Sequence, residues 1–167
     1  MKPEKIKRYR LGVSRNFPTT HPRKGEPTQF EAKIQFALHN NKFWQKLHTI
    51  RANYPLWEKR MKEVKAGRAV IELFYWENKP YRSKQVVFAV LDKDSGCGVQ
   101  ELDMSIFLSH SMGFVNFKEL TFSGSKEFDI KTLAKNDGLS LDDFKAWFKK
   151  YDLSQPMAII HFTSFRY

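Results

Sequence analysis

The sequence predicts an α+β fold in which five or six strands curl into a small barrel, with about three flanking helices. Short amphipathic helix patterns and short apolar runs follow one another without the regular strand–helix alternation of a doubly wound sheet. The 167 residues, 41% hydrophobic and 15% aromatic, are enough to build one packed core. We therefore expect residues 1–167 to form a single domain.

The N-terminal part predicts a strand, a loop and a helix. Residues 9–13 suit a strand, whereas three prolines and a glycine exclude regular structure from residues 16–27. Thr28 followed by Glu31 has the spacing of a capping box, so a first helix should begin there and end near Asn40. Its apolar face would consist of Phe30, Ile34, Ala37 and Leu38.

The central part predicts three strands and a second helix. Residues 46–51, KLHTIR, alternate in polarity and include β-branched side chains, as strands do. A helix should follow, with Pro55 at its first position, Gly67 after its end, and an apolar stripe of Trp57, Met61 and Val64. Residues 69–76 and 85–91 are expected to be strands joined through a turn at 78–80.

The C-terminal part predicts strands at residues 99–107, 116–122 and 157–165. The last of these is apolar on both faces, so we expect it to be a central, buried strand. Ser140 and Asp143 have capping-box spacing, which predicts a third helix. The wide aromatic face of that helix would consist of Phe144, Trp147, Phe148 and Tyr151.

The net charge of +11 is concentrated in two blocks. Residues 1–24 contain eight Lys/Arg against Glu4 alone, and residues 41–68 contain eight against Glu58 and Glu63. Such an asymmetric charge is typical of proteins that bind a polyanion, because each neutralised phosphate releases counterions. The alternative is a solvated basic surface that only aids solubility.

Several classes of protein receive no support. No apolar run approaches the ~20 residues of a membrane span, and no secretory signal is visible, so we expect a cytoplasmic protein. Cys97 is the only cysteine, the histidines have no paired spacing, and residues 95–98 lack the glycine spacing and lysine of a phosphate-binding loop. We therefore expect no metal and no cofactor. A Ser/His/Asp triad stays open, although no nucleophile elbow is present.

Aromatic side chains alternate with Lys and Arg in the central third, a combination that can stack on bases and hold phosphates. Trp57 and Trp147 lie on apolar helical stripes, so they are expected in the core. The aromatic residues next to turns and charges are better ligand candidates: Trp44, Tyr54, Trp76 and Tyr81, with Arg82 beside the last. His161, on a buried strand, is expected to be a hydrogen-bonded core histidine.

Residues 44–51, WQKLHTIR, resemble the Gly-x-Lys-x-x-Thr-x-Arg signature of ASCH domains, which are small PUA-like barrels. Residues 64–70, 137–144 and 157–165 resemble the later segments of that family in the same order, so the resemblance extends from about residue 29 to the end. It implies a PUA-like β-barrel that recognises RNA or a modified nucleoside in a basic cleft at its mouth. Residues 1–28 would be a basic extension.

One branch of that family, the small N4-acetylcytidine amidohydrolases, implies an enzymatic alternative. The resemblance assigns the signature lysine to Lys46, the threonine to Thr49 and the later carboxylate to Asp137. A lysine of lowered pKa can activate a threonine hydroxyl, and a carboxylic acid can protonate the departing amine. Three departures are evident. Trp44 replaces the signature glycine, and Asp137 is shorter than the family's glutamate. The chain is also much longer than the compact amidohydrolases, with an extra basic N-terminal loop and the helix that contains Trp57.

Strand alternation places Thr49 and Arg51 on one face and Lys46 on the other, unless Lys46 precedes the regular strand or sits at a bulge. We expect Thr49 and Arg51 to line the pocket floor and Lys46 its rim, with His48 beside them. The loop of residues 17–28, which contains His21, Arg23 and Lys24, would act as a lid. RNA or nucleoside binding is our main expectation and deacylation the alternative, with DNA left open.

Overall fold

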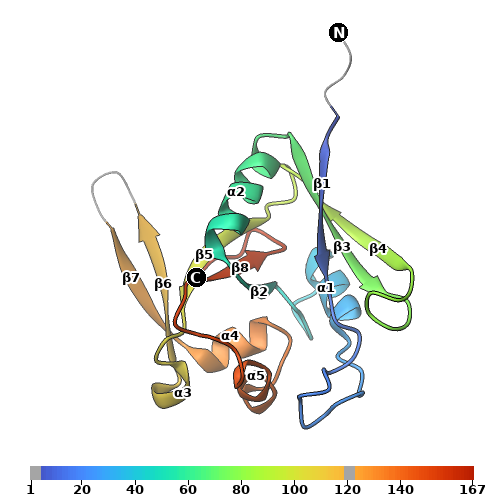
Figure 1. Ribbon diagram of the computed structural model, residues 1–167. Coiled ribbons are helices and arrows are strands. Elements are labelled where there is room, and N and C mark those ends of the chain that lie inside the picture. Colours follow the sequence, from blue (N-terminus) through green and yellow to red (C-terminus); the bar gives the residue numbers. More distant parts are fainter. Residues whose placement is uncertain (1–4, 119–122) are drawn as a thin grey trace.

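The computed structural model describes residues 5–118 and 123–167, which form two sheets (Figure 1). One sheet has the order β1-β3-β4, with β1 parallel and β4 antiparallel to β3: β1 (Lys7–Gly12), β3 (Ala69–Trp76) and β4 (Gln85–Leu91). The other is antiparallel, with the order β2-β8-β5-β6-β7: β2 (His48–Ala52), β8 (Met157–His161), β5 (Gly98–Asp103), β6 (Met112–Lys118) and β7 (Ser123–Asp129). The α+β class is confirmed. The described residues form two open sheets, so the expected barrel is not confirmed.

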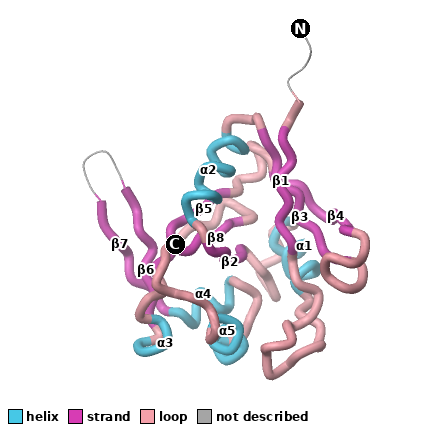
Figure 2. The backbone as a smooth tube through the Cα atoms, viewed as in Figure 1, coloured by secondary structure: helices cyan, strands magenta, loops and turns pink. Residues whose placement is uncertain are grey.

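Five helices accompany the strands in the described residues: α1 (Phe30–Leu38), α2 (Tyr54–Lys65), α3 (Phe107–His110), α4 (Ile130–Asn136) and α5 (Leu141–Phe148). In Figure 2, α2 lies at one end of the molecule beside β5 and β8, while α4 and α5 lie at the other end. The counts exceed the expected five or six strands and three helices. Helices α3 and α4 are too short to show a helical period, and β7 was not predicted because its sequence, SGSKEFD, contains only one large apolar residue.

The core is one cluster of buried side chains to which both sheets and all five helices contribute. Strand β8 lies between β2 and β5, and all five of its residues are buried. The expectation of a central, buried last strand is therefore confirmed, although β8 ends at His161 and not at Phe165. Because β2 pairs directly with β8, the segment that carries the predicted site lies against the centre of the core.

The predicted helix starts have different outcomes. Ser140 caps α5 as expected, accepting a hydrogen bond from Asp143 N at 3.1 Å. Helix α2 begins at Tyr54, so Pro55 is its second residue and not its first; its cap is Asn53, which accepts from Leu56 N at 3.3 Å and was not predicted. The capping box expected at Thr28 is wrong, because the N-cap of α1 is Gln29. The Thr28 hydroxyl donates to Ser14 O at 2.7 Å and accepts from Phe30 N, so it joins the preceding loop to the helix.

Three other boundaries differ from the expected ones. Strand β2 begins at His48, so Lys46 lies outside it. Strand β5 ends at Asp103, because the chain turns at Met104, whose carbonyl accepts from Phe107 N at 3.0 Å, and continues into α3. Helix α5 ends at Phe148, before Tyr151. The strand expected at residues 116–122 overlaps the end of β6, and its residues 119–122 lie outside the described part.

Candidate functional site

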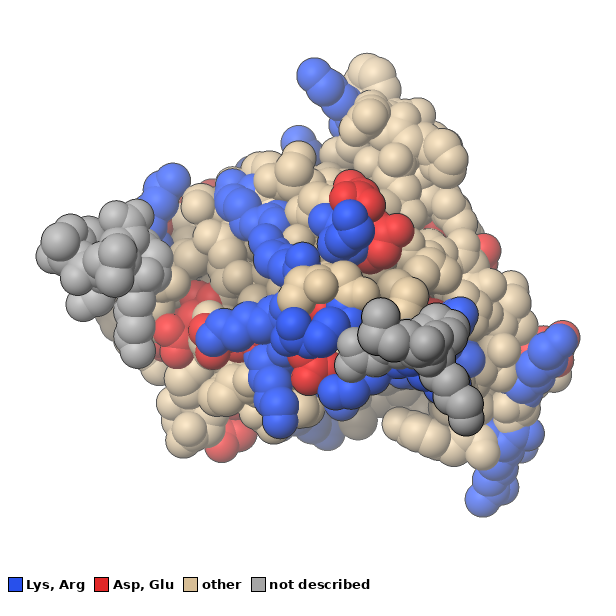
Figure 3. Space-filling model, turned by 90° about the horizontal axis from the view of Figure 1, so that it is seen from above, with Lys and Arg blue, Asp and Glu red and all other residues tan. Residues whose placement is uncertain are grey.

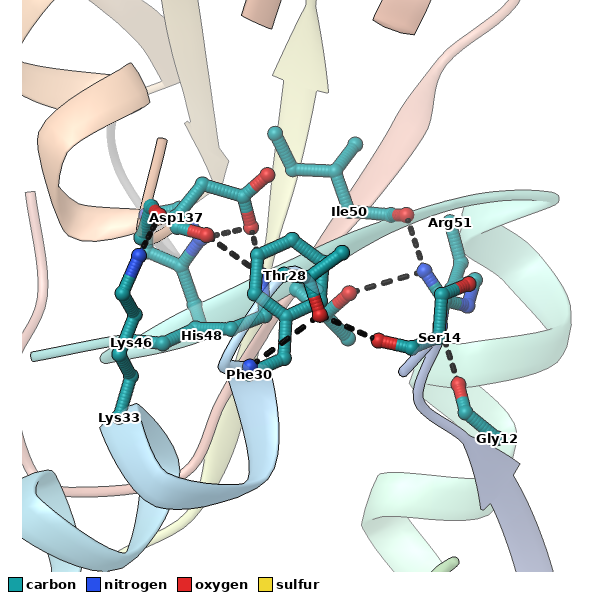
Figure 4. Close-up of polar contacts among 12 residues, drawn as sticks. Gly12, Ser14, Thr28, Phe30, Lys33, Lys46, His48, Ile50, Arg51 and Asp137 are labelled. Atoms are coloured by element: carbon teal, nitrogen blue, oxygen red, sulfur yellow. Dashed lines mark hydrogen bonds and ion pairs between the residues drawn. The ribbon is translucent and has the colours of Figure 1, made fainter. Parts of the chain in front are cut away.

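Lys46 and Asp137 form a buried ion pair between the segment before β2 and the end of α4 (Figure 4). Lys46 Nζ donates to the carboxylate Oδ1 and to the main-chain carbonyl of Asp137, both at 2.7 Å. The same ammonium lies 4.1 Å from the centre of the Phe30 ring. Lys46 is only 2% exposed and Asp137 5%, so this ion pair is almost entirely removed from water.

The backbone around Lys46 explains how a lysine comes to be buried. Lys46 N donates to Lys33 O at 3.1 Å, and Leu47 N donates to Asn136 O at 2.7 Å, which fixes the segment between α1 and α4. Gly138 follows Asp137 with φ +79, and a Cβ there would lie 3.1 Å from Lys46 Cβ. Of the two ways in which Lys46 could approach its neighbours, the structure therefore has the first, in which Lys46 precedes the regular strand.

His48 lies between the Lys46–Asp137 ion pair and the C-terminal residue Tyr167. Its Nδ1 lies 3.5 Å from Asp137 Oδ1, and its Nε2 lies 2.7 Å from the Tyr167 hydroxyl, which also accepts from Asn136 Nδ2 at 3.0 Å. His161 is buried beside it and contacts Gln100 Oε1 through Nε2 at 2.8 Å. His161 was expected to be a hydrogen-bonded core histidine. This holds for its Nε2 but not for its Nδ1, which has no partner among the described residues.

Burial and pairing shift the pKa values of this cluster. Burial lowers the pKa of Lys46 to about 8, although the charge of Asp137 opposes this shift. Burial alone would raise the pKa of Asp137, but the charge of Lys46 and the His48 ring 3.5 Å away outweigh it, so that pKa is lowered. Burial lowers the pKa of His48 and brings that of His161 to about 2, so both imidazoles are neutral at pH 7.

Thr49 and Arg51 form a separate contact on the other face of β2. Arg51 Nη1 donates to Thr49 Oγ1 at 2.8 Å, and Nη2 donates to Gly12 O at 2.5 Å (Figure 4). Since Gly12 belongs to β1, Arg51 connects the two sheets. No hydrogen bond within residues 5–118 and 123–167 joins Thr49 to Lys46, so the structure brings Lys46 together with Asp137 and His48 but not directly with Thr49.

The expected lid packs against α5. Arg23 forms ion pairs of 2.6 Å with both Glu26 and Asp143, and His21 Nε2 lies 3.1 Å from Asp143 O. Lys24 is exposed at a turn of the same loop. This loop is thereby held on α5, and the contacts that hold it do not include the Lys46–Asp137 pair.

The remaining predicted ligand residues are dispersed. Tyr54 begins α2, and its hydroxyl lies 3.4 Å from Glu58; burial raises its pKa to about 12. Tyr81 is 88% exposed on the β3–β4 hairpin, next to Trp76 and Arg82. Figure 1 shows this hairpin on the opposite side of the molecule from β6 and β7. Trp44 is half exposed, at the start of the segment that leads to Lys46.

Among the cavities of the described residues, two border α1. The larger, of about 940 Å³, lies between the loop after β1, α1 and the β3–β4 hairpin, and its charges are mixed: Arg15, Lys79, Glu31 and Glu77. The smaller, of about 310 Å³, lies between α1, the loop before β2 and the turn from α4 to α5. We call it the lysine pocket, because its side chains include Lys33, Lys42, Lys135, Trp44, Gln45 and Asn136.

Of the side chains that line the lysine pocket, Trp44 was predicted as a ligand residue from the sequence. Lys33, Lys42, Lys135 and Asn136 were not predicted, since they come from two segments about a hundred residues apart. The capping motif at Ser140 does mark the turn that closes the pocket. Nothing local in the sequence, however, indicates that this turn lies beside Trp44.

A second basic region, which we call the basic face, is formed by the start of β1 and the exposed side of α2: Lys5, Lys7, Lys59, Arg60, Lys62, Lys65 and Arg68. Seen from this end of the molecule, Lys and Arg side chains run in a band across the surface (Figure 3). Lys7 N donates to Arg68 O at 3.0 Å, and Arg60 lies 5.0 Å from the ring centre of Tyr9. The two basic blocks of the sequence therefore meet in space.

No helix in the described part of the chain is long and apolar enough to cross a membrane. Those residues also contain no group of three or more His, Cys, Asp or Glu side chains arranged to hold a metal ion. No protein-family model, curated protein or solved structure significantly matches this chain.

Proposed function

We propose that this protein binds single-stranded RNA through the basic face. The observation that carries this proposal is the meeting of two basic blocks, distant in sequence, at one end of the molecule (Figure 3). Of the acids beside them, Glu63 pairs with Lys7 at 3.1 Å and Glu58 with Lys62 at 3.5 Å. Three basic residues of this face have no ion-pair partner within residues 5–118 and 123–167: Lys59, Lys65 and Arg68. They can therefore bind phosphates without first breaking an existing ion pair.

Exposed aromatic side chains favour unpaired bases over a duplex as the ligand. Tyr81 is 88% and Trp44 51% exposed, Tyr81 beside Arg82 and Trp44 beside Lys33. Both rings lie outside the basic face, so only a strand longer than that face would reach them. Stacking on such rings adds about 1–3 kcal/mol per base and requires bases that are free to leave a helix. A single strand offers both phosphates and free bases, whereas A-form duplexes expose mainly phosphates and 2′-hydroxyl groups.

A relation to ASCH domains is part of this proposal. The spacing of Lys46, Thr49 and Arg51 supports it, and so does the position of Asp137 against Lys46. In this interpretation the two open sheets, which Arg51 connects through Gly12, correspond to the halves of an open PUA-like barrel.

The test is the salt dependence of RNA affinity. We expect a labelled single-stranded 20-mer RNA to bind with an affinity that falls steeply with salt, and the variant K59Q/K65Q/R68Q to bind more weakly with a shallower slope. Each lost phosphate contact should reduce the slope of log K against log salt by about 0.7. Fluorescence anisotropy measures both quantities. The control is K149Q/K150Q, which removes two exposed lysines after α5, away from the basic face.

If the triple variant binds RNA with the wild-type affinity and slope, the basic face is not the RNA site. A DNA 20-mer of the same sequence, measured in parallel, separates RNA recognition from general affinity for nucleic acids.

Deacylation of a modified nucleoside is a second candidate, favoured by the contact of Lys46 with Asp137 and by the pKa of about 8 for Lys46. A base of that pKa can accept a proton near neutral pH. Its weakness is access, because Lys46 is 2% exposed and its ammonium is bound by Asp137. Release of cytidine from N4-acetylcytidine, absent in K46A and T49A proteins that stay folded, would establish this activity.

A further inference from the structure

The lysine pocket has the size and lining of a site for one nucleotide. Its volume of about 310 Å³ lies at the lower end of the range for small-molecule sites. It is open to solvent at Lys42 and Lys135, both of which are exposed, and it is closed on the inside by the turn between α4 and α5. A pocket of this volume suits a small ligand with a single ring system.

The charge of the lysine pocket points to a phosphate. Three lysines line it and no carboxylate does, while Asp137, directly behind it, is already paired with Lys46. Lys33 Nζ donates to Gly138 O at 2.7 Å, which holds one ammonium at the inner wall and leaves its other N–H groups for a ligand. Asp143, the acid of the adjoining helix, is held by Arg23 at 2.6 Å. Lys42 and Lys135 have no ion-pair partner within residues 5–118 and 123–167.

The lining also provides a surface for a base. Trp44 is 51% exposed and is positioned by an edge contact with Phe36, at 5.6 Å between ring centres and 88° between planes. Lys33 Nζ lies 5.4 Å from the centre of the Trp44 ring, so aromatic ring and ammonium adjoin. The Asn136 amide, which donates to Tyr167, and the Gln45 amide, which donates to Asn41, provide polar groups beside the ring.

We propose that the lysine pocket binds a single nucleotide of a ribonucleic acid, with its phosphate among Lys33, Lys42 and Lys135 and its base on Trp44. The proposal rests on the proposed function for its ligand class, but it concerns another surface. The basic face lies at the end of the molecule with α2, whereas α4 and α5 border the pocket at the other end (Figure 1).

The test uses the full chain and small probes that cannot reach both surfaces. Binding of each of the four ribonucleoside 5′-monophosphates, of the four nucleosides and of inorganic phosphate is measured by isothermal titration calorimetry. At least one monophosphate should bind tenfold or more tightly than its nucleoside and than phosphate. The variants K42Q/K135Q and W44A should each weaken that binding at least tenfold, while W44A leaves the binding of inorganic phosphate unchanged.

The control variant K59Q/K65Q changes only the basic face, so it should bind the monophosphate as the wild type does. The proposal is overturned if no monophosphate binds, if nucleoside and nucleotide bind equally, or if K42Q/K135Q and W44A bind like the wild type. Circular dichroism of each variant verifies that the fold is intact.

If the 20-mer RNA binds through the basic face but no monophosphate binds, the pocket proposal falls and the proposed function stands. If a monophosphate binds with the expected variant effects but the 20-mer shows no salt-dependent binding, the proposed function falls and the pocket is a nucleotide site in its own right.

Discussion

Lys46 and Lys42 are four residues apart in the sequence, yet they lie in opposite environments. Lys46 is 2% exposed, bound to Asp137 and close to the Phe30 ring, whereas Lys42 is exposed at the rim of the lysine pocket. Removal of one partner of a buried ion pair strongly destabilises a protein, because the other charge is left buried without compensation. An exposed, unpaired lysine contributes little to stability but can bind an anion. The same type of side chain therefore stabilises the fold at position 46 and is available to bind an anion at position 42.

The largest expected effect comes from removing one charge of the buried pair. Lys46→Met should lower the free energy of unfolding by about 3–5 kcal/mol, because the Asp137 carboxylate would stay buried without its partner. The matched substitution Lys42→Met should change it by less than about 0.5 kcal/mol. Urea unfolding of both variants measures the difference. Equal losses would remove the distinction between the two lysines.

The free energy of unfolding should also depend on pH below 7, because the region around Lys46 contains two buried, neutral histidines, His48 and His161. His161 has its pKa lowered to about 2 in the folded protein, so below about pH 6.5 only the unfolded chain takes up its proton. Stability should therefore fall with decreasing pH by about 1.4 kcal/mol per unit for His161, with a contribution of the same sign from His48.

The measurement is urea unfolding of the wild type and His161→Gln between pH 7 and pH 5. The variant keeps an amide that can contact Gln100 but does not titrate, so its stability should depend less on pH. Identical pH dependence in the two proteins would mean that His161 takes up its proton in the folded state as well.

The smallest expected effect is at Gly138, which lies between Lys46 of the buried ion pair and Lys33 of the lysine pocket. Its φ of +79 disfavours any side chain, and an added Cβ would lie 3.1 Å from Lys46 Cβ and 3.3 Å from Lys33 Cδ. Gly138→Ala should therefore cost about 1–2 kcal/mol of stability. It should also displace Lys33, whose ammonium is bound to Gly138 O, and weaken nucleotide binding. Thermal unfolding and calorimetry provide both values, with Gly25→Ala as the control, since Gly25 has a similar φ of +80 but no atom near its Cβ.

The fold was predictable where the signal is local. The cap at Ser140, the apolar stripe of α2 and the doubly apolar run of β8 each depend on residues within a few positions, and each is present in the structure. The prediction at Thr28 failed because the role of its hydroxyl depends on a contact with a distant segment. Thr28 has the spacing of a capping box, but its hydroxyl binds Ser14 O, a loop carbonyl that no sequence window identifies as its partner.

The candidate site shows the same division. Sequence similarity selected Lys46 and Asp137, and they meet at 2.7 Å. It did not indicate that the ammonium is enclosed, because its burial depends on Phe30 and on the turn at Gly138. The lysine pocket was not predicted, since Lys42 and Lys135 acquire a common role only when α4 is placed beside the loop before β2.

By itself, the sequence determined the mixture of helices and strands, the excess of positive charge and its concentration in two blocks. Only the tertiary structure decided which of those charges are available. It brings the two blocks together along β1 and α2, buries Lys46 against a residue 91 positions away and leaves Lys42 in water. The physical reason is that exclusion of water and the pairing of charges depend on contacts between distant segments, whereas the periodicity of a sequence reports only its local neighbours.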